Sequence, residues 1–131
     1  MKRFLSVAIL AAALAASAVA AAAAGELGAG EIAFKACRIC HQIGESARNF
    51  VGPELNGVLG RKAGSVPGYN YSDANKHSGV VWDEATLAKY LRKPREVVPG
   101  TKMAFPGFDS DSDIANVISY LKQFGPDGKK P

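Results

Sequence analysis

The pentad Cys-Arg-Ile-Cys-His at residues 37–41 is the stretch whose residue types and spacing could do chemistry. Two cysteines separated by two residues and followed by a histidine fit a redox-active dithiol, half of a zinc site, or the covalent anchor of a haem. A thioredoxin-type dithiol is expected beside a βαβ pattern, which the sequence lacks. A structural zinc site takes four ligands, commonly as two pairs, and the chain has no second such pair. The pentad therefore favours covalent haem attachment.

In such a site, the thiols of Cys37 and Cys40 would each add to one vinyl group of the porphyrin, and the imidazole of His41 would hold the iron as its proximal ligand. The ligand at the sixth position decides between an electron carrier and a catalyst. Met103 is the only methionine besides Met1. Its soft sulfur, in a Pro-Gly-Thr-Lys-Met loop, is the favoured sixth ligand. The alternatives are that Met103 only fills the core, or that His77, which is expected on the surface, takes its place.

The first 24 residues have the features of a secretory signal peptide: Lys2 and Arg3, an apolar stretch over residues 4–14, and small residues before the expected cleavage near residues 20–24. The apolar stretch is shorter than the ~20 residues of a membrane span, which disfavours a membrane anchor. Residues 25–131 are expected to form one domain in the periplasm. Export also fits the pentad, because thiols held as thioethers are protected in an oxidising compartment.

The charge of the chain gives no sign of a nucleic-acid partner. Loss of Lys2 and Arg3 with the leader lowers the formal net charge by two from +4. No long basic run and no basic stripe with interleaved aromatic residues follows. We therefore expect no binding to nucleic acid.

Three main helices are expected after the leader. The first spans residues 25–39, with Ile32, Ala33 and Ala36 as its apolar face. The second begins after the N-cap Asp83 and closes at Pro94. A loop follows over residues 95–110, and the last helix spans residues 112–124 before Gly-Pro at 125–126 stops it. Residues 126–131 are expected to be a solvated, frayed tail.

Residues 42–79 are rich in Gly, Pro, Asn and Ser, and are expected to form loops with one helical turn after Ser72. So long an irregular stretch is unusual inside a compact domain. It becomes reasonable if the loops wrap a large rigid ligand that completes a small core. The predicted fold is all-α, with three main helices and long loops around one haem.

With these residues in place, the chain resembles the class I c-type cytochromes, in the branch of bacterial cytochromes c2 and mitochondrial cytochrome c. The resemblance runs over residues 30–124. It rests on "CRICH", "VGPELNGVLGRKAG", "GYNYSDANKHSGVVW" and "YLRKPREVVPGTKMAF", which occur in the order and spacing of that family. It implies the small cytochrome c fold, one covalently bound haem c with its iron, and electron transfer rather than enzymatic activity.

The resemblance also implies roles for further residues. Pro53 would support His41 through its carbonyl group, and Phe105 would lie beside the exposed haem edge. Three side chains would hydrogen-bond a buried haem propionate, directly or through water: Arg61, Tyr71 and Trp82. A polar cluster would surround the methionine side of the haem: Asn75, Tyr90 and Thr101. The first and last helices would cross through four residues: Gly30, Phe34, Val117 and Tyr120.

Eukaryotic members of this family surround the exposed haem edge with lysines, and the present chain departs from that pattern. Ala36, Phe50 and Asp109 stand at positions of that ring, whereas four cations remain: Lys35, Arg48, Arg95 and Lys102. Because charge around the edge guides docking, the thinner ring puts partners of the mitochondrial kind in doubt.

The chain is expected to be a monomeric, soluble periplasmic electron carrier that docks only transiently on membrane complexes. A cytochrome bc1-type complex would be the electron donor, and an oxidase, a reaction centre or a periplasmic dehydrogenase would be the other partner. The alternative is an enzyme or gas sensor with a five-coordinate haem, in which Met103 is merely packed nearby.

Overall fold

The computed structural model describes residues 27–131. The predicted signal peptide, residues 1–24, lies outside them. The described part of the chain begins with a helix over residues 27–38. Four labelled helices follow: α2 (Asp73–Lys76), α3 (Glu84–Arg92), α4 (Pro94–Val97) and α5 (Asp111–Lys122). The only β pairing within residues 27–131 is an isolated bridge between Lys62 and Val81. The all-α prediction is therefore confirmed.

Side-chain caps explain where the helices begin. The carboxylate of Asp83 accepts a hydrogen bond from the Thr86 N–H at 2.7 Å, as predicted. The turn predicted after Ser72 is α2, and the Ser72 hydroxyl caps it. The last helix begins at Asp111, one residue earlier than expected, because the Ser110 hydroxyl caps it, and it ends at Lys122 rather than at residue 124. Such shifts of one or two residues are usual at helix ends.

The prediction of a loop from residue 95 is wrong for its first residues, which form α4. Pro94 was expected to close the preceding helix. The preceding helix does end directly before it, with Lys93 as its C-cap, and Pro94 also occupies the first turn of α4, where its fixed φ suits a helix and its missing N–H would have no partner. Lys93 is the residue at which α3 ends and α4 begins.

The apolar face predicted for the first helix is wrong for two of its three residues, whereas the third, Ala33, is partly buried and packs on the core. Ile32 is 66% exposed and Ala36 is exposed, whereas Gly30 and Phe34 are buried. The buried face is rotated by about a third of a turn from the predicted one, because it is set by the helix that crosses it and not by the most apolar residues.

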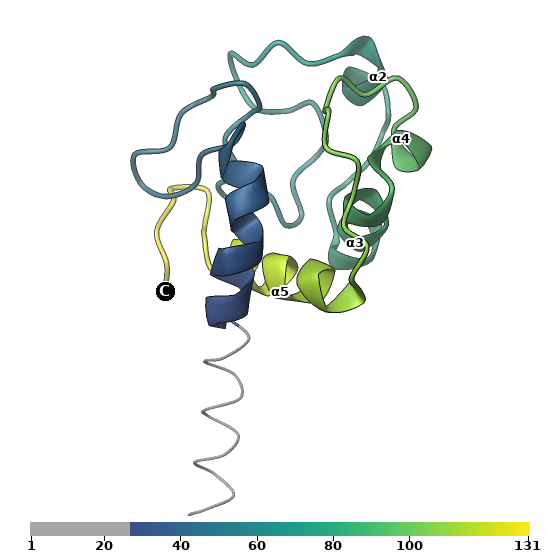
Figure 1. Cartoon of the computed structure of the whole chain (residues 1–131). Helices are drawn as coiled ribbons and strands as arrows, with labels where there is room; N and C mark the ends of the chain where they lie inside the picture. Colours follow the sequence, from purple (N-terminus) through teal and green to yellow (C-terminus); the bar gives the residue numbers. More distant parts are fainter. Residues whose placement is uncertain (1–26) are drawn as a thin grey trace, which may run out of the picture.

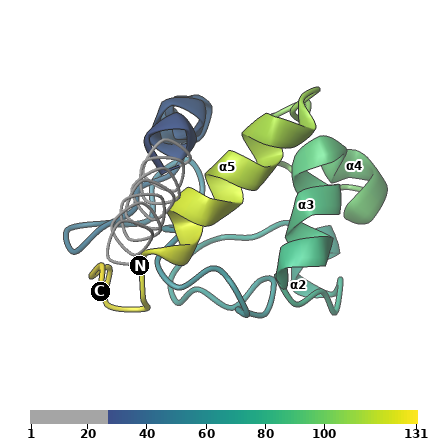
Figure 2. The ribbon, with the colours of Figure 1, turned by 90° about the horizontal axis from the view of Figure 1, so that it is seen from below.

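The crossing of the first helix and α5 is the one implied by the family resemblance. A Cβ atom at Gly30 would lie 2.2 Å from the carbonyl oxygen of Asn116, so only glycine permits this approach. The rings of Phe34 and Tyr120 pack with their centroids 5.1 Å apart, and Val117 is fully buried. Figure 2 shows α5 running from this crossing towards α3.

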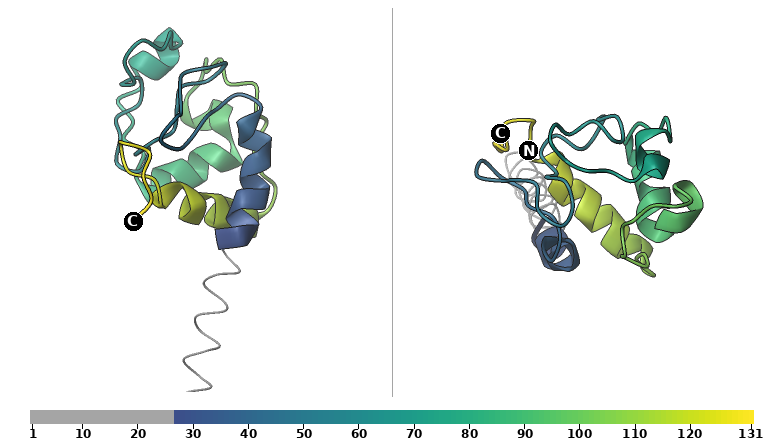
Figure 3. Two further views of the ribbon diagram at one scale, coloured as in Figure 1. Left: turned by 90° about the vertical axis from the view of Figure 1, so that its left-hand side faces the viewer. Right: turned by 90° about the horizontal axis from the view of Figure 1, so that it is seen from above.

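The loops lie on the other side of the molecule from α5. Figure 1 and the further views in Figure 3 show long irregular segments between the first helix and α3, arched over the interior, with α5 at the base. Within residues 27–131, no helix combines the length and apolar character needed to cross a bilayer.

The C-terminal segment is not the frayed tail that we expected. The Gly125 N–H donates to the Lys129 carbonyl at 3.0 Å, and the Gly128 N–H donates to the Gly125 carbonyl at 2.9 Å. Gly128 adopts φ of +78°, and its Cα packs so closely on Gly44 that a Cβ atom would lie 2.3 Å from that backbone. The tail is therefore a turn packed on the loop after the pentad.

Candidate functional site

A cavity of about 390 Å³ lies between the loops and the helices. Its volume falls in the ordinary range of ligand and cofactor sites. All of the residues predicted for the site line it: Cys37, Cys40, His41, Pro53, Arg61, Tyr71, Asn75, Trp82, Tyr90, Thr101, Met103 and Phe105. His77 is not among the lining residues and is exposed, as expected. The structure thus gathers residues that span nearly 70 positions of sequence around one space.

The pentad leaves the first helix in a tight turn at the cavity wall. The N–H groups of Cys40 and His41 both donate to the Cys37 carbonyl, at 3.1 and 2.9 Å. Burial first, and the neighbouring Cys40 second, raise the pKa of the Cys37 thiol to about 11. Redox-active dithiols have lowered thiol pKa values, so this environment does not suit thioredoxin-type chemistry.

The zinc interpretation of the pentad finds no support in the described chain either. Among residues 27–131, no three side chains of His, Cys, Asp or Glu converge on one point. A structural zinc site needs four such ligands. The donors at the cavity are instead one imidazole, two thiols and one thioether, a set that suits haem iron and covalent haem attachment.

His41 is held in one orientation by the carbonyl predicted for that role. Its Nδ1 lies 2.6 Å from the Pro53 oxygen. Because a carbonyl oxygen can only accept, Nδ1 carries the hydrogen and Nε2 keeps its lone pair. Burial lowers the pKa of His41, the hydrogen bond to Pro53 opposes that effect, and the charge of Arg61 adds to the lowering. The neutral ring with a free Nε2 is the form that binds iron.

Gly52 is a site residue that the sequence reasoning missed. A Cβ atom there would lie 2.4 Å from Cε1 of His41, so the backbone packs directly on the imidazole face. The Gly52 N–H also donates to the Cys40 carbonyl at 2.8 Å. The only sign of this role in the sequence was the position of Gly52 directly before Pro53.

Met103 lies in the cavity wall with polar groups around it. The Tyr90 hydroxyl is placed to donate to the Met103 sulfur at 3.7 Å and lies 3.4 Å from the Thr101 hydroxyl. The Met103 N–H donates to that same Thr101 hydroxyl at 3.3 Å. Burial raises the pKa of Tyr90, so the hydroxyl keeps its proton. The polar cluster expected beside the methionine therefore contains Tyr90 and Thr101.

Asn75 also lines the cavity, and its Oδ1 is buried without a hydrogen-bond partner among residues 27–131. A buried acceptor without a donor is costly. An unpaired polar atom in a cavity wall is the mark of a space built to hold a bound group, which fits a cofactor site.

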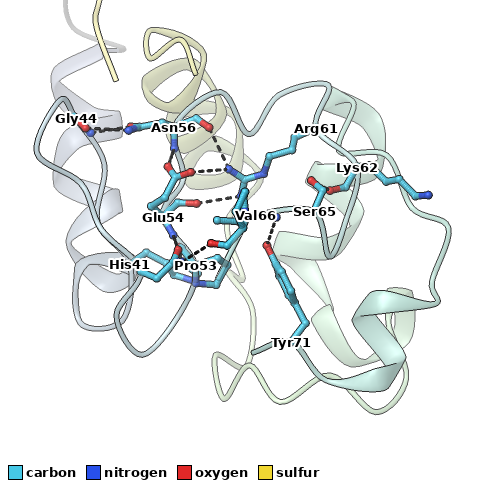
Figure 4. A network of polar contacts seen from close by, with 12 residues as sticks. His41, Gly44, Pro53, Glu54, Asn56, Arg61, Lys62, Ser65, Val66 and Tyr71 are labelled. Carbon is cyan, nitrogen blue, oxygen red and sulfur yellow. Dashed lines mark hydrogen bonds and ion pairs between the residues drawn. The ribbon is translucent and has the colours of Figure 1, made fainter. Parts of the chain in front are cut away.

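The three residues expected to bind a haem propionate meet at another part of the wall. Arg61 donates to the carbonyls of Asn56 and Glu54, each at 3.0 Å. The Tyr71 hydroxyl accepts from the Val66 N–H at 3.0 Å, which leaves its own hydrogen available to the cavity. Trp82 is buried, with its ring centroid 4.6 Å from that of Tyr90. Figure 4 shows Arg61 and Tyr71 in this polar network.

Two further lining residues, Tyr69 and Lys102, connect three loops, and we call this pair the clasp. The Lys102 ammonium lies 4.7 Å from the centre of the Tyr69 ring and donates to the Asn70 carbonyl. The Tyr69 hydroxyl donates to the Val51 carbonyl at 2.7 Å. The position of Lys102 next to Met103 was the only hint of it in the sequence.

Phe105 lines the cavity beyond Met103, and its ring packs on Phe108 with centroids 4.9 Å apart. Arg92 donates to the carbonyls of Phe108 and Asp109 and forms an ion pair with Asp111. The Phe108 N–H in turn donates to the Leu91 carbonyl at 2.8 Å. The segment after Met103 is thus fixed to the end of α3.

Comparison with known proteins agrees with this site. No family model matches the chain. Cytochrome c2 from Rhodoplanes tepidamans is 54% identical over 99 residues, which are 76% of this chain and 92% of that protein. Cytochrome c-554 from Methylosinus trichosporium is 56% identical over 97 residues, 74% of each chain. The solved structure of cytochrome cH from Methylobacterium extorquens has a TM-score of 0.70 at 47% identity and covers 73% of this chain and 96% of that one.

The chain therefore belongs to the class I c-type cytochromes. Proteins of this family are electron carriers, not enzymes, and hold one covalently bound haem c. The cysteine pair and histidine of residues 37–41 supply the attachment motif of that cofactor.

Proposed function

We propose that the chain is a periplasmic electron carrier whose haem is attached through Cys37 and Cys40 and whose iron is held by His41 and Met103. The observation that supports this most is the pairing of the two donors. His41 and Met103 line one cavity, and each is held by its own hydrogen bond, from Nδ1 to Pro53 and from Tyr90 to the sulfur.

The bound haem supplies a reversible one-electron change, and the chain determines how readily it occurs. A thioether is a soft ligand, and His/Met ligation is associated with raised reduction potentials. Because both side chains are fixed by neighbours, little has to move when the charge changes. Arg61, Tyr71 and Trp82 would receive a haem propionate, which would be costly to bury without donors.

We expect electrons to pass at the haem edge beside Phe105, through brief complexes of the small kind typical of redox partners. A cytochrome bc1-type complex is the proposed donor, and an oxidase, a reaction centre or a periplasmic dehydrogenase is the proposed acceptor or second donor. Phe50, at a position of the family's lysine ring, is 60% exposed. A partner surface with some apolar area would suit it.

The test of axial ligation is a visible spectrum of the exported protein, oxidised and reduced, with carbon monoxide added to the reduced sample. If His41 and Met103 fill both axial positions, the c-type bands do not move with carbon monoxide. A shifted Soret band would show an open iron and would favour the enzyme or sensor alternative. N-terminal sequencing of the protein from a periplasmic fraction tests export and cleavage near residues 20–24.

A further inference from the structure

Glu54 is a carboxylate fixed directly behind the cavity wall. It follows Pro53, but it is not itself a lining residue. Its N–H donates to the Asn49 side chain at 3.0 Å, and its Oε2 accepts from the Asn56 N–H at 2.6 Å. Its Oε1 lies 3.6 Å from the Arg61 guanidinium. Figure 4 shows Glu54 between the Pro53–His41 contact and Arg61.

The pair that Glu54 forms with Arg61 is shielded from solvent. The two side chains are 22% and 16% exposed. By contrast, the side chains of the Lys93–Glu96 pair are 61% and 70% exposed. Salt screens exposed pairs strongly and shielded pairs much less. The electrostatic field of Glu54 and Arg61 therefore reaches neighbouring groups with less screening than that of the surface pair.

The charge of Arg61 acts on the site itself. Arg61 lines the cavity, and its guanidinium group is held there by hydrogen bonds to the carbonyls of Asn56 and Glu54. The negative charge of Glu54 raises the pKa of Arg61 against the effect of burial, and it also contributes to the raised pKa of Tyr71. Lys62 also lines the cavity, but the residue is exposed, and its ammonium group extends away from Glu54 and Arg61 in Figure 4.

We propose that Glu54 is a positioning and charge-compensating residue that lowers the reduction potential of the haem. It holds Arg61 and offsets its positive charge at the wall. The inference rests on the proposed function as an electron carrier. Reduction adds one electron, supplied by the donor protein, and no bond to Glu54 or Arg61 forms or breaks. Because reduction lowers the positive charge of the site, a fixed anion nearby opposes it and a fixed cation favours it.

The experiment is a redox titration of the haem-containing protein carrying Glu54→Gln, with Glu45→Gln as the matched control. Glu45 is exposed, so the two variants change the net charge equally. Glutamine keeps an oxygen that can accept from the Asn56 N–H. We expect Glu54→Gln to raise the reduced-to-oxidised ratio at a fixed ambient potential by on the order of threefold, at low and at high salt. Glu45→Gln should change it little, and less still at high salt.

Two further variants separate charge from structure. Glu54→Asp keeps the charge with a shorter side chain, so it should lose stability but keep the potential close to that of the unaltered protein. Glu54→Ala is a second neutral variant and should raise the potential as Gln does. The inference is overturned if Glu54→Gln shifts the ratio no more than Glu45→Gln does, or if Glu54→Asp shifts it as much as the neutral variants do.

The carbon monoxide test on the unaltered protein keeps this inference separate from the proposed function. A carbon monoxide shift in the unaltered protein would contradict His/Met ligation whatever Glu54 does. An unmoved spectrum together with equal potentials for the Glu54 and Glu45 variants would reject the role of Glu54 alone.

Discussion

The histidine side and the methionine side of the cavity are held in different ways. His41 is fixed by a single short hydrogen bond to Pro53, twelve residues away, and by the close packing of Gly52. Met103 is surrounded by longer contacts to Tyr90 and Thr101, at 3.3–3.7 Å. A half-buried charged pair lies behind the first side, whereas neutral hydroxyls border the second. The histidine side is thus a compact local structure, and the methionine side depends on contacts between distant segments.

This difference indicates which ligand yields first. The contacts of His41 come from one loop and from the adjoining pentad. Those of Met103 require α3, its own loop and the clasp to stay together. We therefore expect denaturant or a competing ligand to release the Met103 sulfur before the His41 imidazole. The Met103 contacts are longer and join segments farther apart in the sequence, so they open at a lower free-energy cost.

Met103→Ala should have the largest effect on the methionine side. With the sulfur gone, the sixth position opens, reduced protein binds carbon monoxide, and the potential falls by more than about 100 mV because a ligand that favours the reduced state is lost. A redox titration and a carbon monoxide titration measure both changes. An unchanged potential would remove Met103 from the coordination sphere.

Gly52→Ala should disturb the packing on the histidine side. The new methyl group would lie 2.4 Å from the imidazole, so the ring or the loop must shift. We expect the free energy of unfolding to fall by about 1–3 kcal/mol, measured by denaturant titration. The control is Gly28→Ala, since a Cβ atom there meets nothing within 4 Å, and stability should stay the same or rise. Equal effects of both changes would mean that Gly52 does not support His41.

Lys102→Gln removes the cation of the clasp without adding a second thioether beside Met103. The cation over the Tyr69 ring is worth about 1 kcal/mol, so imidazole should displace Met103 from the oxidised protein about fivefold more readily. Absorbance titration with imidazole measures this affinity. Lys122→Gln is the control, because Lys122 pairs with Glu84 and does not line the cavity. If both lysine variants bind imidazole equally, the clasp does not hold the methionine loop.

Salt should have the smallest effect, and it probes the surface rather than either side of the cavity. The rate of electron transfer with an acidic redox partner should fall by less than about tenfold from low to physiological salt, because only part of the cationic ring remains. Stopped-flow rates at several ionic strengths measure the slope. A rate that does not depend on salt would show that the remaining cations play no part in docking.

The sequence predicted the contents of the site better than its arrangement. The attachment motif, Met103 and the resemblance together named twelve of the residues that line the cavity, because each of these is marked by a motif or by a matched position. Glu54, Asn56 and Gly52 were missed, since their roles come from the path of the loop that carries Pro53. The apolar face of the first helix was misjudged for a similar reason. Its buried side is decided by α5, and Ile32 is left exposed.

The short helix α4 and the folded tail show the same limit. Pro94 marks the end of α3, as the sequence predicted, but the sequence did not show that a second helix begins at the same residue. The tail looked solvated by composition, but the glycines at 44 and 128 permit a backbone contact that composition does not reveal.

By itself, the sequence determined the chemistry of this protein: the residues that can tether a haem, the candidate iron ligands, the helix caps and the thinner ring of cations. These follow from side-chain types and short spacings, which act locally. Only the tertiary structure decided which side chains form hydrogen bonds and ion pairs with one another. The tautomer of His41, the contact of Tyr90 with the Met103 sulfur and the pairing of Glu54 with Arg61 depend on distances between loops. Hydrogen bonds and ion pairs form only when their atoms lie within a few ångströms of each other, so their partners are known only once the chain has folded.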